Sequence, residues 1–158
     1  MIPGMQLASI TPAPLSNAAT PVPDMRATFR EYTSALFAPP GVVSVGWGIN
    51  RPDTISLSVQ NAELALLADR VLADSIDGVK LLITSRTDTG EVPADSWVRN
   101  RSNVARAMAA LPGVVDWLRF GGITLLADSR ERVAWLRKVV SADIDGTPVR
   151  IMLREDLP

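Results

Sequence analysis

The second half of this chain is a diverged copy of its first half. Residues 55–86 align without a gap over residues 123–154, at an offset of 68 positions. A further match lies upstream, where Pro40-Gly-Val-Val corresponds to Pro112-Gly-Val-Val at an offset of 72. The two offsets differ by four, which places one insertion in the first copy between Val43 and Ile55. Because both copies must satisfy one topology, the duplication restricts the possible folds more than any local propensity does.

An Ile-Asp-Gly tripeptide occurs at the same place in each copy, at residues 76–78 and 144–146. Asp-Gly is a common turn sequence, so both copies are expected to turn there. The other identical positions in the gapless alignment are Ile55/Ile123, Leu57/Leu125, Glu63/Glu131, Val71/Val139, Ile83/Ile151 and Arg86/Arg154.

The composition is that of an ordinary globular protein and argues against several classes of function. Apolar residues make up 47% and charged residues 21% of the 158 positions, and the net charge is −1. General nucleic-acid binding requires many cations, so we expect no nucleic-acid partner. No run reaches the roughly 20 apolar residues of a membrane span, and the N-terminus lacks the apolar core of a secretory signal peptide. We therefore expect a cytoplasmic protein without a membrane span.

Histidine and cysteine are both absent. Their absence excludes Ser-His-Asp triads, histidine-ligated metals, thiolate nucleophiles and disulfides. The best carboxylate pairs are Asp74 with Asp77 and Asp143 with Asp145, but these occupy turns where Asp-Gly has a sufficient structural reason. We therefore predict no catalytic residue, no metal ligand and no cofactor.

Residues 1–23 contain five prolines and no charged side chain. Proline fixes φ and removes a backbone donor, so neither a helix nor a strand can extend far here. We expect a flexible leader or a strap along the body. Its content of Ser, Thr, Ala and Pro also resembles the unstructured export signals of type III secretion clients. Export by a route that needs no signal peptide is therefore the alternative localisation.

Residues 24–90 are expected to form the first copy. Asp24 is a suitable N-cap for a helix whose apolar stripe is Met25, Phe29, Tyr32 and Leu36. Strands are predicted at residues 42–48 and 55–59, a helix capped by Asn61 at 62–73, and a strand at 79–85. The order is α-β-β-α-β.

Residues 91–158 are expected to form the second copy, after a polar linker at 87–95. A helix is predicted at 96–111, strands at 114–120 and 123–127, a helix capped by Ser129 that ends near residue 140, and a strand at 148–153. The order is again α-β-β-α-β. We therefore predict an α+β fold made by internal duplication: two three-stranded sheets, each with two helices, packed as one pseudo-twofold cooperative unit.

The module order and the run from Gly122 to Val140 resemble the BON domain and the related ring-building modules of secretion systems. The resemblance implies a role in envelope binding or ring assembly rather than catalysis. Two departures are present. Ala127 and Val59 stand where the BON pattern usually has glycine, and neither copy has the closing Gly-Val-x-x-Val-x-Asn.

The insertion in the first copy is the first place to look for function, because loops on a duplicated scaffold often carry binding residues. It offers Trp47 at the end of a strand, followed by Asn50, Arg51 and Asp53. Arg51 and Asp53 flank Pro52, so a fixed turn could present a cation and an anion to a partner. The alternative is an ordinary hairpin loop in which Asp53 bonds its own backbone.

Two further residues are candidates for partner contact. Leu66 lies on the helix at 62–73, which is apolar nearly all round and therefore needs cover from the second copy, the leader or another chain. Trp135 stands between Arg132 and Lys138 at the position of Leu67, where it could belong to the rim of a core or to a binding surface.

We therefore expect a non-enzymatic module that binds a protein partner or a second copy of itself, in association with bacterial protein secretion. The alternative is a small-molecule-binding module, or an enzyme that works without histidine, with its site between the copies. A cleft in which Arg51, Arg119 and a carboxylate converge would favour that alternative.

Deleting residues 1–22 is expected to leave the Tm nearly unchanged, because a charge-free, proline-rich leader contributes little to a packed core. Thermal unfolding of the full and shortened chains, followed by circular dichroism, checks this. A large drop in Tm would show that the leader packs against the body.

Overall fold

A computed structural model describes residues 24–48, 50–87, 91–119 and 122–157. The expected leader at 1–23 lies outside the described residues, as does part of the expected linker at 88–90. The first copy contains α1 (Met25–Leu36), β1 (Val42–Gly46), β2 (Thr54–Val59), α2 (Ala62–Val71), β3 (Ser75–Ile76) and β4 (Val79–Ser85). The second contains the 3-10 turn η1 (Trp97–Arg99), α3 (Arg101–Ala109), β5 (Val114–Arg119), β6 (Ile123–Ala127), α4 (Arg130–Val139), β7 (Asp143–Ile144) and β8 (Thr147–Leu153), followed by η2 (Arg154–Asp156).

The expected caps start three of the helices. Asp24 Oδ1 accepts a hydrogen bond from the backbone N–H of Ala27, Asn61 Oδ1 from that of Leu64, and Ser129 Oγ from that of Arg132. Each bond satisfies an N–H group that has no partner within its helix. The caps therefore fix where α1, α2 and α4 begin.

The single helix expected at 96–111 is interrupted, and this prediction was wrong in detail. Asn100 has an extended backbone (φ −73°, ψ 125°) and its side chain accepts hydrogen bonds from the backbone N–H groups of Ser102 and Asn103. Asparagine competes for backbone donors in this way, which makes it a good cap and a poor interior residue. The segment is therefore divided into η1 and α3.

Each sheet has four strands rather than the three expected, in the orders β1-β2-β4-β3 and β5-β6-β8-β7. The additional strands β3 and β7 come from the Asp-Gly turns. Asp77 and Asp145 both have φ 52°, and the following glycines both have φ 83°. Two such residues form a primed two-residue hairpin turn, which requires that the flanking residues pair antiparallel. Ile76 accordingly pairs with Val79, and Ile144 with Thr147.

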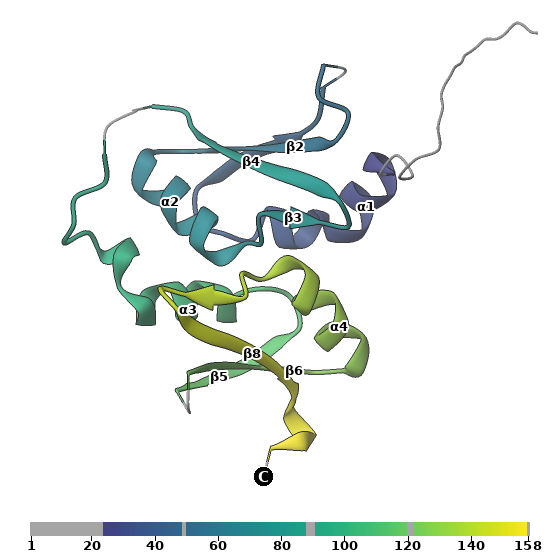
Figure 1. The fold of residues 1–158 in the computed structure, drawn as a ribbon, viewed down its shortest axis with the longest axis vertical. Helices are drawn as coiled ribbons and strands as arrows, with labels where there is room; N and C mark the ends of the chain where they lie inside the picture. Colours follow the sequence, from purple (N-terminus) through teal and green to yellow (C-terminus); the bar gives the residue numbers. More distant parts are fainter. Residues whose placement is uncertain (1–23, 49, 88–90, 120–121, 158) are drawn as a thin grey trace, which may run out of the picture.

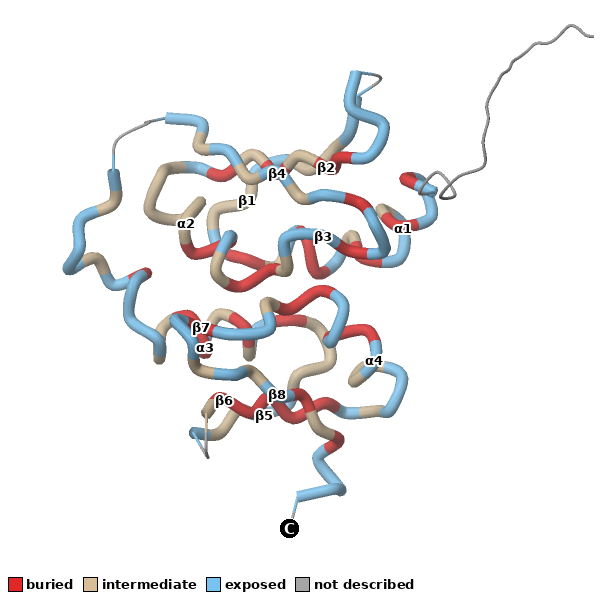
Figure 2. The backbone as a smooth tube through the Cα atoms, viewed as in Figure 1, coloured by how far each residue is buried: buried red, intermediate tan, exposed pale blue. Residues whose placement is uncertain are grey.

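The two copies are stacked with their helices turned toward each other (Figure 1). The two sheets form the outer layers, and α1, α2, α3 and α4 lie between them. Buried positions follow the middle of the molecule (Figure 2), and the core residues of both copies belong to one contiguous cluster. The fold is thus the expected α+β duplication, packed as one unit.

The junction between the copies has pseudo-twofold symmetry in its backbone. Leu72 and Val140, equivalent positions in the alignment, form an antiparallel bridge. The N–H of Ala73 donates to the carbonyl of Val139 (2.8 Å), and the N–H of Ser141 donates to the carbonyl of Val71 (2.9 Å). Two ion pairs repeat the symmetry, Arg70 with Asp145 (2.5 Å) and Lys138 with Asp77 (3.0 Å).

The second copy covers part of the apolar surface of α2. Helix α2 packs against α3 and η1. The Glu63 carboxylate accepts hydrogen bonds from Ser96 Oγ and from the indole N–H of Trp97 (2.8 Å), and Arg70 donates to the carbonyl of Val98 (3.1 Å). The sequence left three candidates to cover this helix: the second copy, the leader and another chain. The structure shows contact with the second copy.

Trp135→Ala is expected to lower the free energy of unfolding by about 3–5 kcal/mol, the usual cost of removing a buried tryptophan. Because the core is continuous, both copies should still unfold in one transition. Urea unfolding followed by far-UV circular dichroism and by fluorescence measures this. Trp97→Ala, which removes an indole that is 46% exposed, should cost markedly less. Two separated transitions would contradict a shared core.

Candidate functional site

Trp47 follows β1 at the root of the β1–β2 hairpin and is 44% exposed. Its indole leans on Phe29 of α1, with ring centroids 5.0 Å apart and the ring planes inclined by 58°. Such tilted aromatic pairs are favourable beyond the area they bury. The contact fixes one side of the Trp47 ring and leaves the other side to solvent.

A shallow groove of about 450 Å³ lies beside Trp47, between the hairpin and the start of α1. Its other lining residues are Asp24, Met25, Arg26, Ala27 and Arg30. The Asp24 carboxylate is used as the helix cap. Within the described part of the chain, neither Arg26 nor Arg30 forms an ion pair. The groove therefore combines an exposed indole with two cations one helical turn apart.

The remaining expected residues of the hairpin are Asn50, Arg51 and Asp53, and all three are exposed. The loop is held by backbone bonds from Arg51 N–H to Gly48 O and from Thr54 N–H to Arg51 O, both 3.2 Å. Asp53 Oδ1 accepts from the Thr54 hydroxyl at 3.1 Å, so this carboxylate is used within its own turn. The structure thus brings Trp47, Asn50, Arg51 and Asp53 onto one hairpin.

Leu66 and Trp135, the other two expected residues, lie elsewhere. Leu66 is half-buried on α2 and packs against the core. Trp135 is only 9% exposed and lies in the junction between the copies, where its indole N–H donates to the carbonyl of Glu31 (3.1 Å). Its ring stacks on Tyr32 at 5.8 Å, and the guanidinium of Arg132 lies 4.4 Å from the ring centroid. Both residues therefore have structural contacts that the sequence did not show.

A second groove, of about 640 Å³, runs between α1 and α4 where the copies meet. The equivalent helices α3 and α2 pack directly against each other. The side chains at the equivalent positions differ: buried Val104 and Leu67 stand where Tyr32 and Trp135 stack on each other. The groove is lined by Glu31, Tyr32, Ser34, Ser129, Glu131, Arg132, Ala134, Trp135 and Lys138.

The titratable groups at this groove form a fixed network around Asp77. Its carboxylate accepts from the Tyr32 hydroxyl (3.3 Å) and pairs with the Lys138 ammonium. Burial raises the pKa of the Tyr32 phenol, and the Asp77 carboxylate raises it further. The hydrogen bond to Asp77 raises the pKa of Lys138. Both changes point away from neutral pH, so Tyr32 remains a neutral donor and Lys138 a cation near pH 7.

Sequence reasoning missed the partners of Trp47. Phe29 and Tyr32 were assigned to one apolar stripe of α1, but they meet different tryptophans, Trp47 and Trp135. The spacing of Arg26 and Arg30 could have indicated a basic site in the sequence, because side chains at i and i+4 lie on the same face of a helix.

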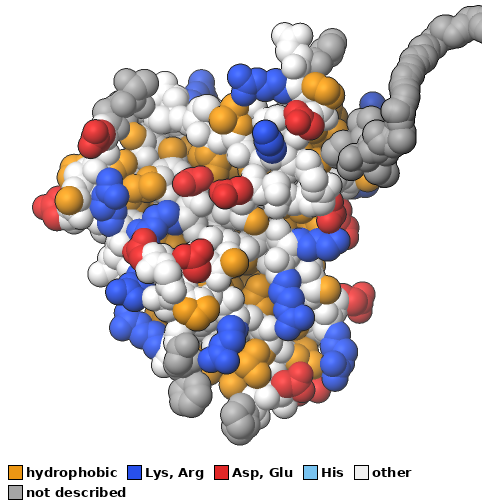
Figure 3. Space-filling model, in the orientation of Figure 1, with side chains coloured by type: hydrophobic (Ala, Val, Ile, Leu, Met, Phe, Trp, Pro, Cys, Tyr) orange, Lys and Arg blue, Asp and Glu red, His pale blue; other side chains and the backbone are white. Residues whose placement is uncertain are grey.

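The side of the molecule drawn in Figure 3 carries a mixture of basic, acidic and apolar side chains.

Comparison with known proteins adds no assignment: no protein-family model, curated protein or solved structure matches this chain. Among the described residues, no helix has the length and apolar character needed to cross a membrane. No group of three or more acidic side chains in the described ranges is placed to hold a metal ion.

Proposed function

We propose that this chain is a non-catalytic protein-binding module whose contact site is the Trp47 groove. The observation that carries the proposal is the half-exposed indole of Trp47, held in place by Phe29 and flanked by Arg26 and Arg30. Tryptophan and arginine are the residues most enriched where truncation weakens protein binding most. An indole already fixed on one side also loses little side-chain entropy when a partner covers it.

The groove favours a partner segment that combines an apolar side chain with a carboxylate. Covering the exposed part of the indole would remove about 100 Å² from water, which contributes roughly 2.5 kcal/mol at about 25 cal/mol per Å². A carboxylate next to that apolar side chain could pair with Arg26 or Arg30, and guanidinium groups bind carboxylates through two parallel hydrogen bonds. A second copy of the chain is one possible source of such a segment.

Membership of a larger assembly linked to bacterial secretion is the broader form of this proposal. Two observations support it: the order α-β-β-α-β that the chain has in common with ring-building modules, and the charge-free, proline-rich composition of residues 1–23. The short strands β3 and β7 are additions to that order.

The alternative function, small-molecule binding between the copies, is favoured by one observation, the open groove between α1 and α4. The particular cleft expected for it is not formed. Arg51 is on the β1–β2 hairpin and Arg119 ends β5, and these two places lie at opposite ends of the molecule (Figure 1). A ligand in the α1–α4 groove would instead meet Tyr32, Arg132 and Lys138.

Trp47→Ala is expected to weaken partner binding by at least about 30-fold in Kd, the equivalent of roughly 2 kcal/mol. The partner would first be captured with the tagged chain from cells that express it and identified by quantitative mass spectrometry. Binding of the purified partner would then be measured by calorimetry. Sedimentation of the chain alone would show whether the partner is a second copy.

Trp97→Ala is the matched control, because Trp97 is equally exposed but lies at η1, where it bonds Glu63. Binding should survive this change. If Trp47→Ala and Trp97→Ala retain the same partners with the same affinity, the Trp47 groove is not the contact site. If the chain instead binds a small molecule, and only substitutions of Tyr32 or Arg132 abolish that binding, the alternative function is correct.

A further inference from the structure

A third hollow, of about 530 Å³, lies in the second copy where the start of α3 meets the end of β5 and the starts of β6 and β8. It is lined by Asn100, Arg101, Ser102, Arg119, Gly122, Ile123 and Thr147. Two of these side chains are cations and none is a carboxylate. Two guanidinium groups that line one hollow repel each other unless an anion lies between them.

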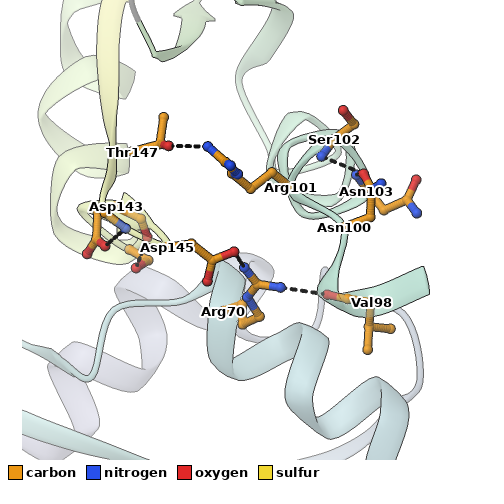
Figure 4. Close-up of polar contacts among 11 residues, drawn as sticks. Arg70, Val98, Asn100, Arg101, Ser102, Asn103, Asp143, Asp145 and Thr147 are labelled. Carbon is orange, nitrogen blue, oxygen red and sulfur yellow. Dashed lines mark hydrogen bonds and ion pairs between the residues drawn. The ribbon is translucent and has the colours of Figure 1, made fainter. Parts of the chain in front are cut away.

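Arg101 is directed across the hollow by a side chain from another element. Its Nη1 donates a 2.7 Å hydrogen bond to the hydroxyl of Thr147, which links α3 to β8 (Figure 4). A guanidinium carries five N–H donors in a planar fork, so one bond leaves most of them available. The contact therefore positions Arg101 without using up its binding capacity.

The carboxylates nearest in the chain to Thr147 are engaged elsewhere. Asp145 pairs with Arg70 of the first copy, and Asp143 Oδ2 accepts from the N–H of Gly146 (2.9 Å). Figure 4 shows the Asp145 carboxylate turned to Arg70 while Arg101 extends to Thr147. Asp145 is thus paired across the junction and Asp143 is used within its own turn, and neither forms an ion pair with Arg101.

Arg119, the last residue of β5, supplies the second cation. Within the described ranges its side chain makes no hydrogen bond and no ion pair. It is opposite Ile123 in the strand register, so the hairpin places it at the rim of the same hollow.

The N-terminus of α3 plays a secondary part. The N–H groups of Ser102 and Asn103 already donate to Asn100 Oδ1, at 2.9 and 3.4 Å. A ligand would therefore be held by the two guanidinium groups and the Ser102 hydroxyl rather than by free helix N–H groups.

We propose that this hollow binds a phosphate dianion, either as inorganic phosphate or as the phosphate group of a small phosphate monoester. A dianion balances two guanidinium charges, whereas a single carboxylate balances one, and arginine binds phosphate oxygens through two parallel hydrogen bonds. The site is separate from the Trp47 groove, since the two lie in different copies, so it goes beyond the protein-binding function.

The test is a titration of the isotope-labelled full chain, followed by ¹H–¹⁵N NMR at constant ionic strength. The probes are inorganic phosphate and O-phosphoserine, with chloride as the reference anion. Saturable shifts are expected at the amides of Arg101, Ser102, Arg119 and Thr147, with one Kd. For O-phosphoserine, binding should weaken below about pH 6, where the phosphate dianion takes up a proton and becomes a monoanion.

Arg119→Gln is expected to raise the Kd at least about tenfold, the effect of losing roughly 1.4 kcal/mol. Arg106→Gln is the matched control, because Arg106 lies on α3, the helix of Arg101, bonds Asn103 (3.1 Å) and does not line the hollow. It should change the Kd by less than about twofold. Unchanged amide spectra away from the site would show that both variants are folded.

Three results would overturn the proposal. Shifts that never saturate, or that chloride reproduces, would mean non-specific association of anions with the surface. Equal weakening by Arg119→Gln and Arg106→Gln would mean that only overall charge matters. None of these results bears on the Trp47 groove, so the two proposals succeed or fail separately.

Discussion

Two main-chain hydrogen bonds exchanged between α2 and α4 hold the two copies in one structure. The last carbonyls of a helix have no partner within it and must be satisfied from outside. Here the carbonyl of Val71 accepts from Ser141 and that of Val139 accepts from Ala73. Each copy therefore completes the helix end of the other. The exchange lies where the helical sides of both copies meet between the sheets, and the apolar core is continuous across this junction.

The symmetry of this junction extends from the backbone to the positions of the two ion pairs, but not to the other side chains of the packed helices. Buried Val104 and Leu67 stand at the positions of Tyr32 and Trp135, the aromatic pair that stacks beside the groove between α1 and α4. A similar divergence separates the Arg70–Asp145 pair, whose arginine is largely buried, from the exposed Lys138–Asp77 pair. The shared positions maintain the fold, and the unshared ones determine what each surface can contact.

Most of the fold could be predicted from the sequence, because an alignment of two copies tests every local assignment twice. The strands β3 and β7 are missing from the sequence prediction because Asp-Gly alone indicates only a turn, whereas a primed turn also requires paired neighbours. Of the candidate site, the four hairpin residues could be grouped, since they are adjacent in the chain. Trp135 could not be placed, because its partners Tyr32 and Glu31 come from the other copy and no local pattern encodes that contact.

Because the junction joins two equivalent copies, the first copy of one molecule could also pack against the second copy of another molecule. Two molecules that exchanged their second copies would form the same Leu72–Val140 bridge and the same ion pairs, now between different polypeptides. The free-energy difference between the closed monomer and such a swapped dimer then depends on the connection between the copies and on concentration, not on the contacts themselves. The length of that connection therefore sets the balance between the closed monomer and the swapped dimer.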